Sequence, residues 1–313
     1  MAEGKRASAH RRIFACMTVY KKIFVCVVLF SVVTRVGIQA IIVNKAVAGG
    51  AEIDPIVPND PSLHSPSGSV PEFGYWEHVG RVGMGSGIYL GDGHVLTSAH
   101  VGCHPFCMGD GSNYQPDYAS WRILDNPEGG KSDLAVFRVE IGGRTSSLAK
   151  LGRLPVGRLK AGDDTPLIMV GTGYGQQHKA VSGEVYHVVL GYETQRQRVK
   201  KWGINLLDEI LKTPVKTAGG YRTHCFVSTF DRAEGEAQAA EGDSGGAMFA
   251  YNTDLARWEV VGCLIAVSQL GTYVPFGART YVGNLGDYRA QLPGLPLPAF
   301  AILAQALVVK TLR

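Results

Sequence analysis

The hydrophobic positions of the chain fall into short runs, each bounded by glycine or polar residues. These runs are Gly87 to Leu90, His94 to Ser98, Leu134 to Glu140, Leu167 to Val170, Val185 to Leu190, Ala247 to Tyr251 and Trp258 to Val267. Alternating or continuous apolar runs of this length, separated by turn residues, are typical of strands in a sandwich or barrel. A helical spacing of apolar residues is found over Ile204 to Lys212 and Leu285 to Leu292. The pattern therefore predicts an all-β body with two helices.

The composition agrees with this prediction. The chain has 313 residues, of which 45% are hydrophobic, and it contains 40 glycines and 15 prolines. Enough apolar residues are present to form a core, which argues against a disordered or collagen-like chain. So much glycine favours strands joined by tight turns over a helical bundle.

The N-terminal segment has a different character from the rest. Residues 1 to 22 are polar and basic, Ile23 to Val33 are apolar apart from Ser31, and Ala46-Val47-Ala48 supplies small residues. This order predicts a secretory signal peptide over residues 1 to 48, cleaved after Ala48. The alternative is an uncleaved signal anchor over Ile23 to Val43, which is long enough to span a bilayer. Both interpretations predict a body that works outside the cytoplasm, in the periplasm, the envelope or the medium.

The charge is divided unevenly along the chain. Residues 1 to 48 hold eight Lys or Arg against one acidic residue, so the remaining residues carry 23 basic against 26 acidic side chains. The body therefore has a net charge of −3, which gives no reason to expect a nucleic-acid partner. Five prolines fall between residues 54 and 71 and predict a linker over 49 to 73. The ordered domain is then expected over 74 to 292.

Three short islands contain residues suited to nucleophilic catalysis. They are Leu96 to Val101 with His100, Lys131 to Val136 with Asp133, and Glu241 to Gly246 with Ser244. The third also fits the Gly-x-Ser-x-Gly elbow of α/β-hydrolases, but that fold places its histidine after the serine, and no histidine follows Ser244. The remaining order is histidine, aspartate, serine, at spacings of 33 and 111 residues.

These islands resemble the catalytic motifs of trypsin-like (chymotrypsin-fold) serine proteases, and the glycine-rich, cysteine-poor sequence is most similar to secreted bacterial members. The resemblance extends from about Gly80 to Leu292 and includes Gly171 to Gly175 and Phe276 to Val282. It implies two six-stranded antiparallel β-barrels with the active site between them, followed by a short C-terminal helix. It also implies a monomer that acts on protein or peptide substrates without a cofactor or metal.

The resemblance assigns a role to each residue of the constellation. Ser244 is the nucleophile, His100 the general base, and Asp133 the group that orients the imidazole. The backbone amides of Gly242 and Ser244 are expected to form the oxyanion hole. The alternative function is a catalytically silent homologue that serves as an extracellular binding module.

The substrate pocket is predicted from position relative to the nucleophile. Gln238, six residues before Ser244, is expected at the pocket floor, and Ile265 and Val267 on one wall. Gln238 lacks the carboxylate that selects Arg or Lys, and Val267 would narrow the slot. We therefore expect a small or medium uncharged residue at P1, the residue before the cleaved bond.

Activation in this family pairs a new N-terminal amine with the aspartate before the nucleophile, here Asp243. The usual Ile-Val-Gly-Gly start is missing, and Lys45 to Gly50 resembles it only faintly. Leader cleavage could supply an amine, or Asp243 could be satisfied from within the body. Some partner is required, because an unpaired buried carboxylate costs several kcal/mol.

The cysteines and two terminal features leave alternatives open. Outside the leader the cysteines are Cys103, Cys107, Cys225 and Cys263, which allow three pairings. Cys103 and Cys107 form a local disulfide, two free thiols or half a metal site. The basic segment Gln195 to Trp202 is interpreted as a solvated loop. The tail, residues 293 to 313, resembles bacterial C-terminal sorting tails or forms a helix on the protein surface, so envelope association is possible through either end.

Overall fold

The computed structural model describes residues 42–43, 73–143, 145–160, 165–173, 177–181, 184–188, 198, 200–230, 237–268 and 277–293. Contacts divide the chain into two units, Met1–Ile38 and Gln39–Arg313, and all described residues belong to the second. Most of the predicted leader, the proline-rich linker up to residue 72 and the tail from residue 294 lie outside the described residues. In the described part, no helix combines the length and apolar character needed to cross a bilayer.

The N-terminal half of the body forms one antiparallel sheet in the order β6-β5-β2-β3-β4-β8-β7. Its strands are β2 (Val79–Val82), β3 (Gly85–Gly91), β4 (His94–Thr97), β5 (Phe106–Cys107), β6 (Asn113–Tyr114), β7 (Pro116–Asp125) and β8 (Lys131–Val139). Neighbours in the sheet are mostly consecutive in sequence, as expected for strands joined by tight turns.

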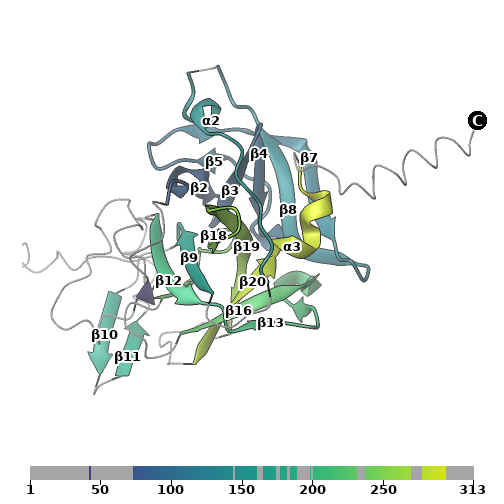
Figure 1. Cartoon of the computed structure of the whole chain (residues 1–313). Helices are drawn as coiled ribbons and strands as arrows, with labels where there is room; N and C mark the ends of the chain where they lie inside the picture. Colours follow the sequence, from purple (N-terminus) through teal and green to yellow (C-terminus); the bar gives the residue numbers. More distant parts are fainter. Residues whose placement is uncertain are drawn as a thin grey trace, which may run out of the picture. The chain divides into compact units, whose positions relative to one another are not determined.

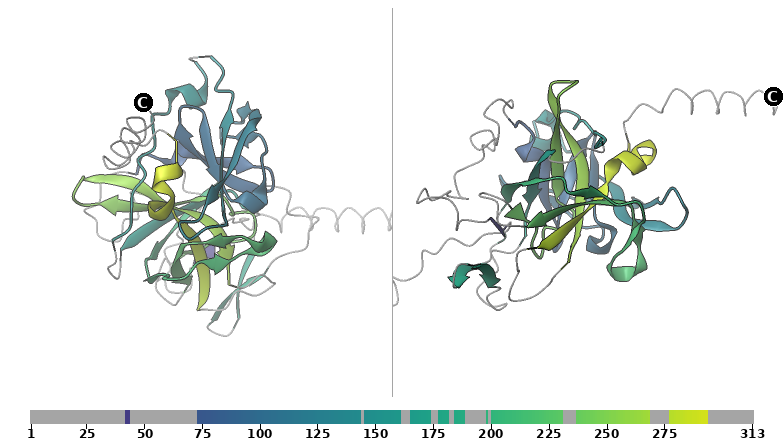
Figure 2. Two further views of the ribbon diagram at one scale, coloured as in Figure 1. Left: turned by 90° about the vertical axis from the view of Figure 1, so that its right-hand side faces the viewer. Right: turned by 60° about the horizontal axis from the view of Figure 1, so that its bottom comes forward.

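The C-terminal half forms a second antiparallel sheet in the order β12-β9-β18-β19-β20-β16-β13. Its strands are β9 (Pro166–Gly171), β12 (Lys201–Leu206), β13 (Glu209–Ile210), β16 (Cys225–Phe230), β18 (Ala247–Asn252), β19 (Arg257–Val267) and β20 (Ala278–Asn284). Figure 1 shows the blue to teal strands of the first sheet above the strands of the second, and the turned views of Figure 2 keep the two groups adjacent.

Short elements complete the fold. The two-stranded pairs are β1 (Ile42–Val43) with β17 (Ala237–Gln238), β10 (Gln177–Val181) with β11 (Glu184–Val188), and β14 (Val215–Lys216) with β15 (Arg222–Thr223). The helical turns are η2 (Trp76–His78), η3 (Ala99–Val101), α2 (Ser147–Lys150), η4 (Ala218–Gly220), α3 (Leu285–Tyr288) and η5 (Arg289–Gln291).

The fold confirms the predicted all-β body with two sheets and a short C-terminal helical segment, formed by α3 and η5. Each sheet has seven strands among the described residues instead of the expected six, because short edge strands such as β6 and β13 extend the pairing. The predicted helix over Ile204 to Lys212 is wrong. That segment continues β12 and forms β13, and Asn205 Nδ2 donates to the carbonyls of Thr229 and Ala237 from the buried face of β12.

Three clusters of buried side chains explain why the strands are apolar on both faces. On β9, Leu167 and Met169 belong to a cluster formed by the second half of the body. Ile168 and Val170, on the opposite face of the strand, belong to the cluster that both sheets share. This alternation follows from the two-residue period of a strand. A third cluster is formed by side chains of the first half of the body alone.

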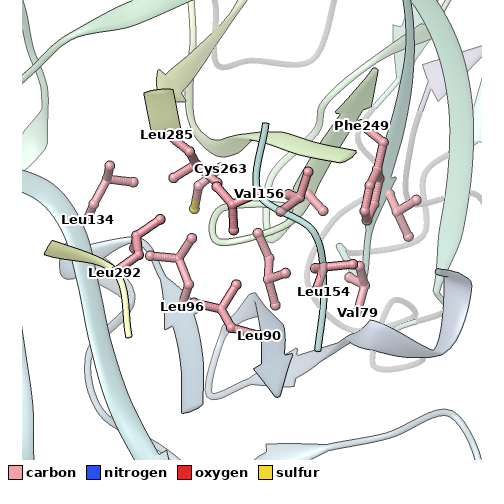
Figure 3. Close-up of a cluster of buried hydrophobic side chains, with 14 of the residues drawn as sticks. Val79, Leu90, Leu96, Leu134, Leu154, Val156, Phe249, Cys263, Leu285 and Leu292 are labelled. Carbon is pink, nitrogen blue, oxygen red and sulfur yellow. The ribbon is translucent and has the colours of Figure 1, made fainter. Parts of the chain in front are cut away.

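The cluster between the sheets holds the two halves together. It draws Leu96 from β4 and Leu134 from β8, Phe249 from β18 and Leu285 from α3 (Figure 3). The described residues between 73 and 292 therefore pack as one body with a shared core, and loops at the junction of the two sheets bring side chains from both sheets to one pocket.

Candidate active site

His100 and Asp133 meet at the junction of two strands in the first sheet. His100 lies on η3, directly after β4, and Asp133 lies on β8, which pairs with β4 at Thr97 and Ala135. The His100 Nδ1 atom is 2.8 Å from Asp133 Oδ2, and the His100 backbone N–H donates to Asp133 Oδ1 at 2.9 Å. The Asp133 side chain is fully buried, whereas the imidazole is 29% exposed. A carboxylate at Nδ1 favours the tautomer that leaves Nε2 free to accept a proton.

Ser244 lies in the turn between β17 and β18, which belongs to the second half of the body. Its carbonyl accepts a 2.6 Å hydrogen bond from the Ser86 amide at the start of β3. The next residue, Gly245, has φ +86°, and an added Cβ would overlap the Ser86 carbonyl oxygen. Only glycine permits this close approach between the two sheets.

The carbonyl oxygen of Leu264 on β19 joins the histidine loop to the serine loop. It accepts from Ser98 Oγ at 2.8 Å and from the Gly245 amide at 2.7 Å. Ser98 is two residues before His100, and Gly245 directly follows Ser244. One acceptor therefore ties together the backbone around the predicted base and nucleophile.

The peptide groups around Ser244 are held by specific hydrogen bonds. The Asp243 amide donates to the Ala240 carbonyl at 3.1 Å, and the Asp243 carbonyl accepts from the Gly246 amide at 2.8 Å. Within the described residues, no acceptor is bonded to the amides of Gly242 and Ser244. Both residues line the same pocket as His100. These two amides are therefore available for an oxygen atom bound in that pocket.

Asp243 is buried beneath this turn and is satisfied from within the body. Its Oδ1 accepts from the Gly173 amide at 2.7 Å and its Oδ2 from the Ala240 amide at 2.8 Å. Burial raises the pKa of Asp243 to about 6, while these two amides and the charges of Arg198 and Lys201 oppose the rise. Each carboxylate oxygen of Asp243 thus accepts one backbone hydrogen bond from within the body, as the internal alternative expects.

The pocket beside Ser244 has a volume of about 610 Å³. Ile265 and Val267, predicted as wall residues, both line it. Gln238, predicted at its floor, is described but lies outside the lining; it is 1% exposed on β17, and neither side-chain amide atom has a partner among the described residues. β17 pairs with β1, with Ile42 opposite Gln238, so two residues of the predicted leader lie beside this strand.

All four cysteines of the body are free thiols. None of the three pairings is formed, so the disulfide alternative is wrong, and Cys103 and Cys107 are the two free thiols of the second alternative. Cys225 and Cys263 flank Gly283 on opposite neighbouring strands, which places them about 10 Å apart, beyond disulfide range. Burial raises the pKa of both thiols. The metal alternative for Cys103 and Cys107 has no support, because the described residues hold no cluster of three His, Cys, Asp or Glu side chains.

The sequence did not single out a set of buried polar residues behind the serine turn. The Ser86 hydroxyl is 2.9 Å from Thr172 Oγ1 and donates to the Gly242 carbonyl at 3.2 Å. Arg198 also contacts Gly242, and Lys201 is only 2% exposed, so the interpretation of their segment as a solvated loop is wrong at these positions. The one sequence signal for the burial of Lys201 is its position at the start of an alternating strand. This signal is weak, because the burial of a charged side chain depends on partners distant in sequence.

The two antiparallel sheets, their shared core and a histidine–aspartate pair that lines one pocket with a serine turn define a two-sheet fold of the chymotrypsin type. A model of the family described as Trypsin matches residues 67–282. The chain therefore belongs to the trypsin family of serine proteases.

Comparison with solved structures gives distant similarity to other proteases. The Rv3671c protease from M. tuberculosis, in its active form, is 15% identical, with a TM-score of 0.45 over 79% of this chain and 89% of that one. The HtrA-type protease AlgW with a decapeptide is 15% identical, with a TM-score of 0.39 over 65% and 48%. The NS6 protease from murine norovirus 1 is 12% identical, with a TM-score of 0.39 over 71% and 97%. No curated protein sequence matches the chain.

Proposed function

We propose that the protein is a serine endopeptidase in which Ser244 attacks the peptide carbonyl, His100 accepts its proton and Asp133 orients the imidazole. The observation that carries this proposal is the 2.8 Å contact between His100 Nδ1 and Asp133 Oδ2, together with the position of His100 and Ser244 on one pocket. In the acylation step the serine oxygen bonds to the carbonyl carbon, and the proton passes through His100 to the leaving amine.

The two free amides of the serine turn fit the second requirement of acyl transfer. Negative charge develops on the substrate carbonyl oxygen in the tetrahedral intermediate, and backbone N–H groups stabilise it. The amides of Gly242 and Ser244 border the pocket and have no acceptor within the described residues. This arrangement favours an enzyme over the binding-module alternative, which needs neither free amides nor an intact base.

The pocket lining supports an uncharged P1 residue. Leu264, Ile265 and Val267 supply apolar walls, and the charged side chains Lys216 and Glu241 are exposed and of opposite sign. A single Arg or Lys at P1 would find no buried carboxylate among these lining residues. Peptide amides with Ala, Val or Leu at P1 are expected to be cut faster than Arg or Lys analogues. The opposite order would refute this assignment.

The reaction itself is tested with a fluorophosphonate probe and a peptide library. We expect the probe to label Ser244, and Ser244→Ala to lower kcat by about a millionfold. Ser147→Ala, on α2 and outside the pocket lining, is the matched serine control and should keep both labelling and turnover. Correctly folded protein that neither binds the probe nor cuts any peptide would favour the binding-module alternative.

The site of action is proposed from the N-terminal sequence. We propose export by the leader, with the enzyme acting outside the cytoplasm, either free or held at the envelope by one of its ends. Cell fractionation with mass spectrometry of the mature termini tests this proposal. Recovery of the intact chain in the cytoplasm only would refute it.

A further inference from the structure

Arg198 donates four hydrogen bonds to described residues, and these bonds join the two sheets at the serine turn. Its Nε donates to the Thr172 carbonyl at 2.9 Å, and its Nη1 to the Gly83 carbonyl at 2.7 Å. Its Nη2 donates to the carbonyls of Gly85 and Gly242, both at 2.9 Å. A planar guanidinium with a fixed fork of donors is suited to hold several acceptors at once, and a charged donor strengthens each bond.

These acceptors belong to three separate parts of the chain. Gly83 and Gly85 lie at the turn between β2 and β3 in the first sheet, and Thr172 follows β9 in the second. Gly242 lies in the turn that carries Ser244. One side chain therefore fixes the serine turn relative to both sheets.

The contact with Gly242 has a specific consequence for the proposed oxyanion hole. The Ser244 amide belongs to the Asp243–Ser244 peptide, whose carbonyl is held by the Gly246 amide. The Gly242 amide belongs to the Glu241–Gly242 peptide, and no hydrogen bond within the described residues holds that peptide. Its direction is therefore set by the two flanking peptides. The Ala240–Glu241 peptide is held by the Asp243 amide, and the Gly242–Asp243 peptide is the one that Arg198 contacts.

The Gly242–Asp243 peptide is fixed at both ends. Its amide donates to the Ala240 carbonyl, and its carbonyl accepts from Arg198 and, at 3.2 Å, from Ser86 Oγ. Gly242 has φ +86° and no side chain to hinder rotation. Without Arg198, the longer bond from Ser86 would be the only described bond that holds the Gly242 carbonyl, and the Gly242 amide could turn away from the pocket.

We propose that Arg198 is a positioning residue that aims the Gly242 amide at the substrate oxyanion by holding the Gly242 carbonyl. This inference rests on the proposed peptidase function, because the oxyanion exists only in acyl transfer. Arg198 does not touch substrate in this role. Its effect is expected in the transition state and not in substrate binding.

The test compares Arg198→Gln and Arg198→Lys with Lys200→Gln as the matched control. Lys200 lies two residues further on and contacts Trp76 and Glu77, so its substitution removes a nearby charge without touching the serine turn. We expect Arg198→Gln to lower kcat about 10- to 100-fold, less than the loss of a complete oxyanion donor, with KM within about twofold. Arg198→Lys should recover part of the loss, and Lys200→Gln should resemble the wild type.

A peptidyl trifluoromethyl ketone separates positioning from general damage, because its hemiketal oxygen occupies the oxyanion site. Its Ki should rise by the same factor as kcat/KM falls, while the Ki of a product peptide stays unchanged. Equal kcat in Arg198→Gln and the wild type, or a loss seen only in KM, would overturn the inference and leave the proposed function intact.

Hydrogen exchange gives a measure that does not need catalysis. Amides of the peptide spanning residues 240–246 should exchange faster in Arg198→Gln than in Lys200→Gln, with equal thermal unfolding of the two variants. Unchanged exchange would overturn the proposed hold on the turn. A wild-type protein without activity or probe labelling would instead refute the peptidase function, whatever the exchange result.

Discussion

The buried carboxylate of Asp243 predicts an unusual dependence of stability on pH. Its pKa is about 6 in the folded protein, mainly because of burial, against an ordinary value of 3.8. A difference of about two pH units corresponds to about 3 kcal/mol. Between these two values the folded state binds more protons than the unfolded chain, so stability falls as pH rises.

The contribution of Asp243 is therefore fully favourable below about pH 3.8 and is lost as pH rises through about 6. We expect the free energy of unfolding to lose about 2.4 kcal/mol from this group between pH 4 and pH 7, with a slope of about 1.2 kcal/mol per pH unit around pH 5. The neutral variant Asp243→Asn should lack this component.

The assay is urea unfolding at several pH values between 4 and 8, in a Ser244→Ala background, so that the proposed peptidase activity cannot digest the protein. The difference between the protein with Asp243 and the Asp243→Asn variant is plotted against pH, so that other titrating groups cancel. The asparagine side chain cannot accept both backbone hydrogen bonds. This loss adds a constant to the difference in the free energy of unfolding, and the constant does not vary with pH. A difference that is flat or rises between pH 4 and pH 7 would refute the reasoning.

Three further substitutions test the arrangement of the site and core. Asp133→Asn removes the carboxylate that accepts from His100 Nδ1 and should lower kcat about 10⁴-fold in steady-state assays, as the wrong tautomer is favoured; a loss under tenfold would contradict the orienting role. Gly245→Ala places a methyl group against the Ser86 carbonyl at a left-handed backbone angle, and should cost more than about 1 kcal/mol in urea unfolding and abolish probe labelling; normal labelling would contradict the close approach. Leu96→Ala empties part of the shared core and should cost about 2 to 5 kcal/mol; a cost under 1 kcal/mol would contradict its burial there.

Local apolar patterns were sufficient to predict a strand where the pattern fitted only one kind of element. The alternating and continuous apolar runs predicted β4, β8, β9, β18 and β19 close to their observed bounds. The helix prediction over Ile204 to Lys212 failed because leucine and isoleucine spacing over nine residues fits a strand pair as well as a helix. Pairing of β12 with β9 and of β13 with β16 decided between them.

The order of the motifs in the sequence predicted the candidate site, but it did not predict the residues that hold the site in place. His100, Asp133 and Ser244 stood in recognisable islands, whereas Arg198 stood in a basic segment that resembles a surface loop. Its four acceptors come from three parts of the chain, and no spacing rule connects them. Gln238 shows the reverse case, since its position in sequence predicted the pocket floor and the structure buries it outside the lining.

The sequence by itself determined the fold class, the candidate side chains for catalysis and the uneven charge between residues 1–48 and the rest of the chain, because residue type and local spacing act over a few neighbours. Tertiary structure alone decided the free state of the cysteines, the internal hydrogen bonds of Asp243 and the hydrogen bonds of Arg198. Each of these depends on which strands become adjacent, and adjacency is set by packing of the whole core.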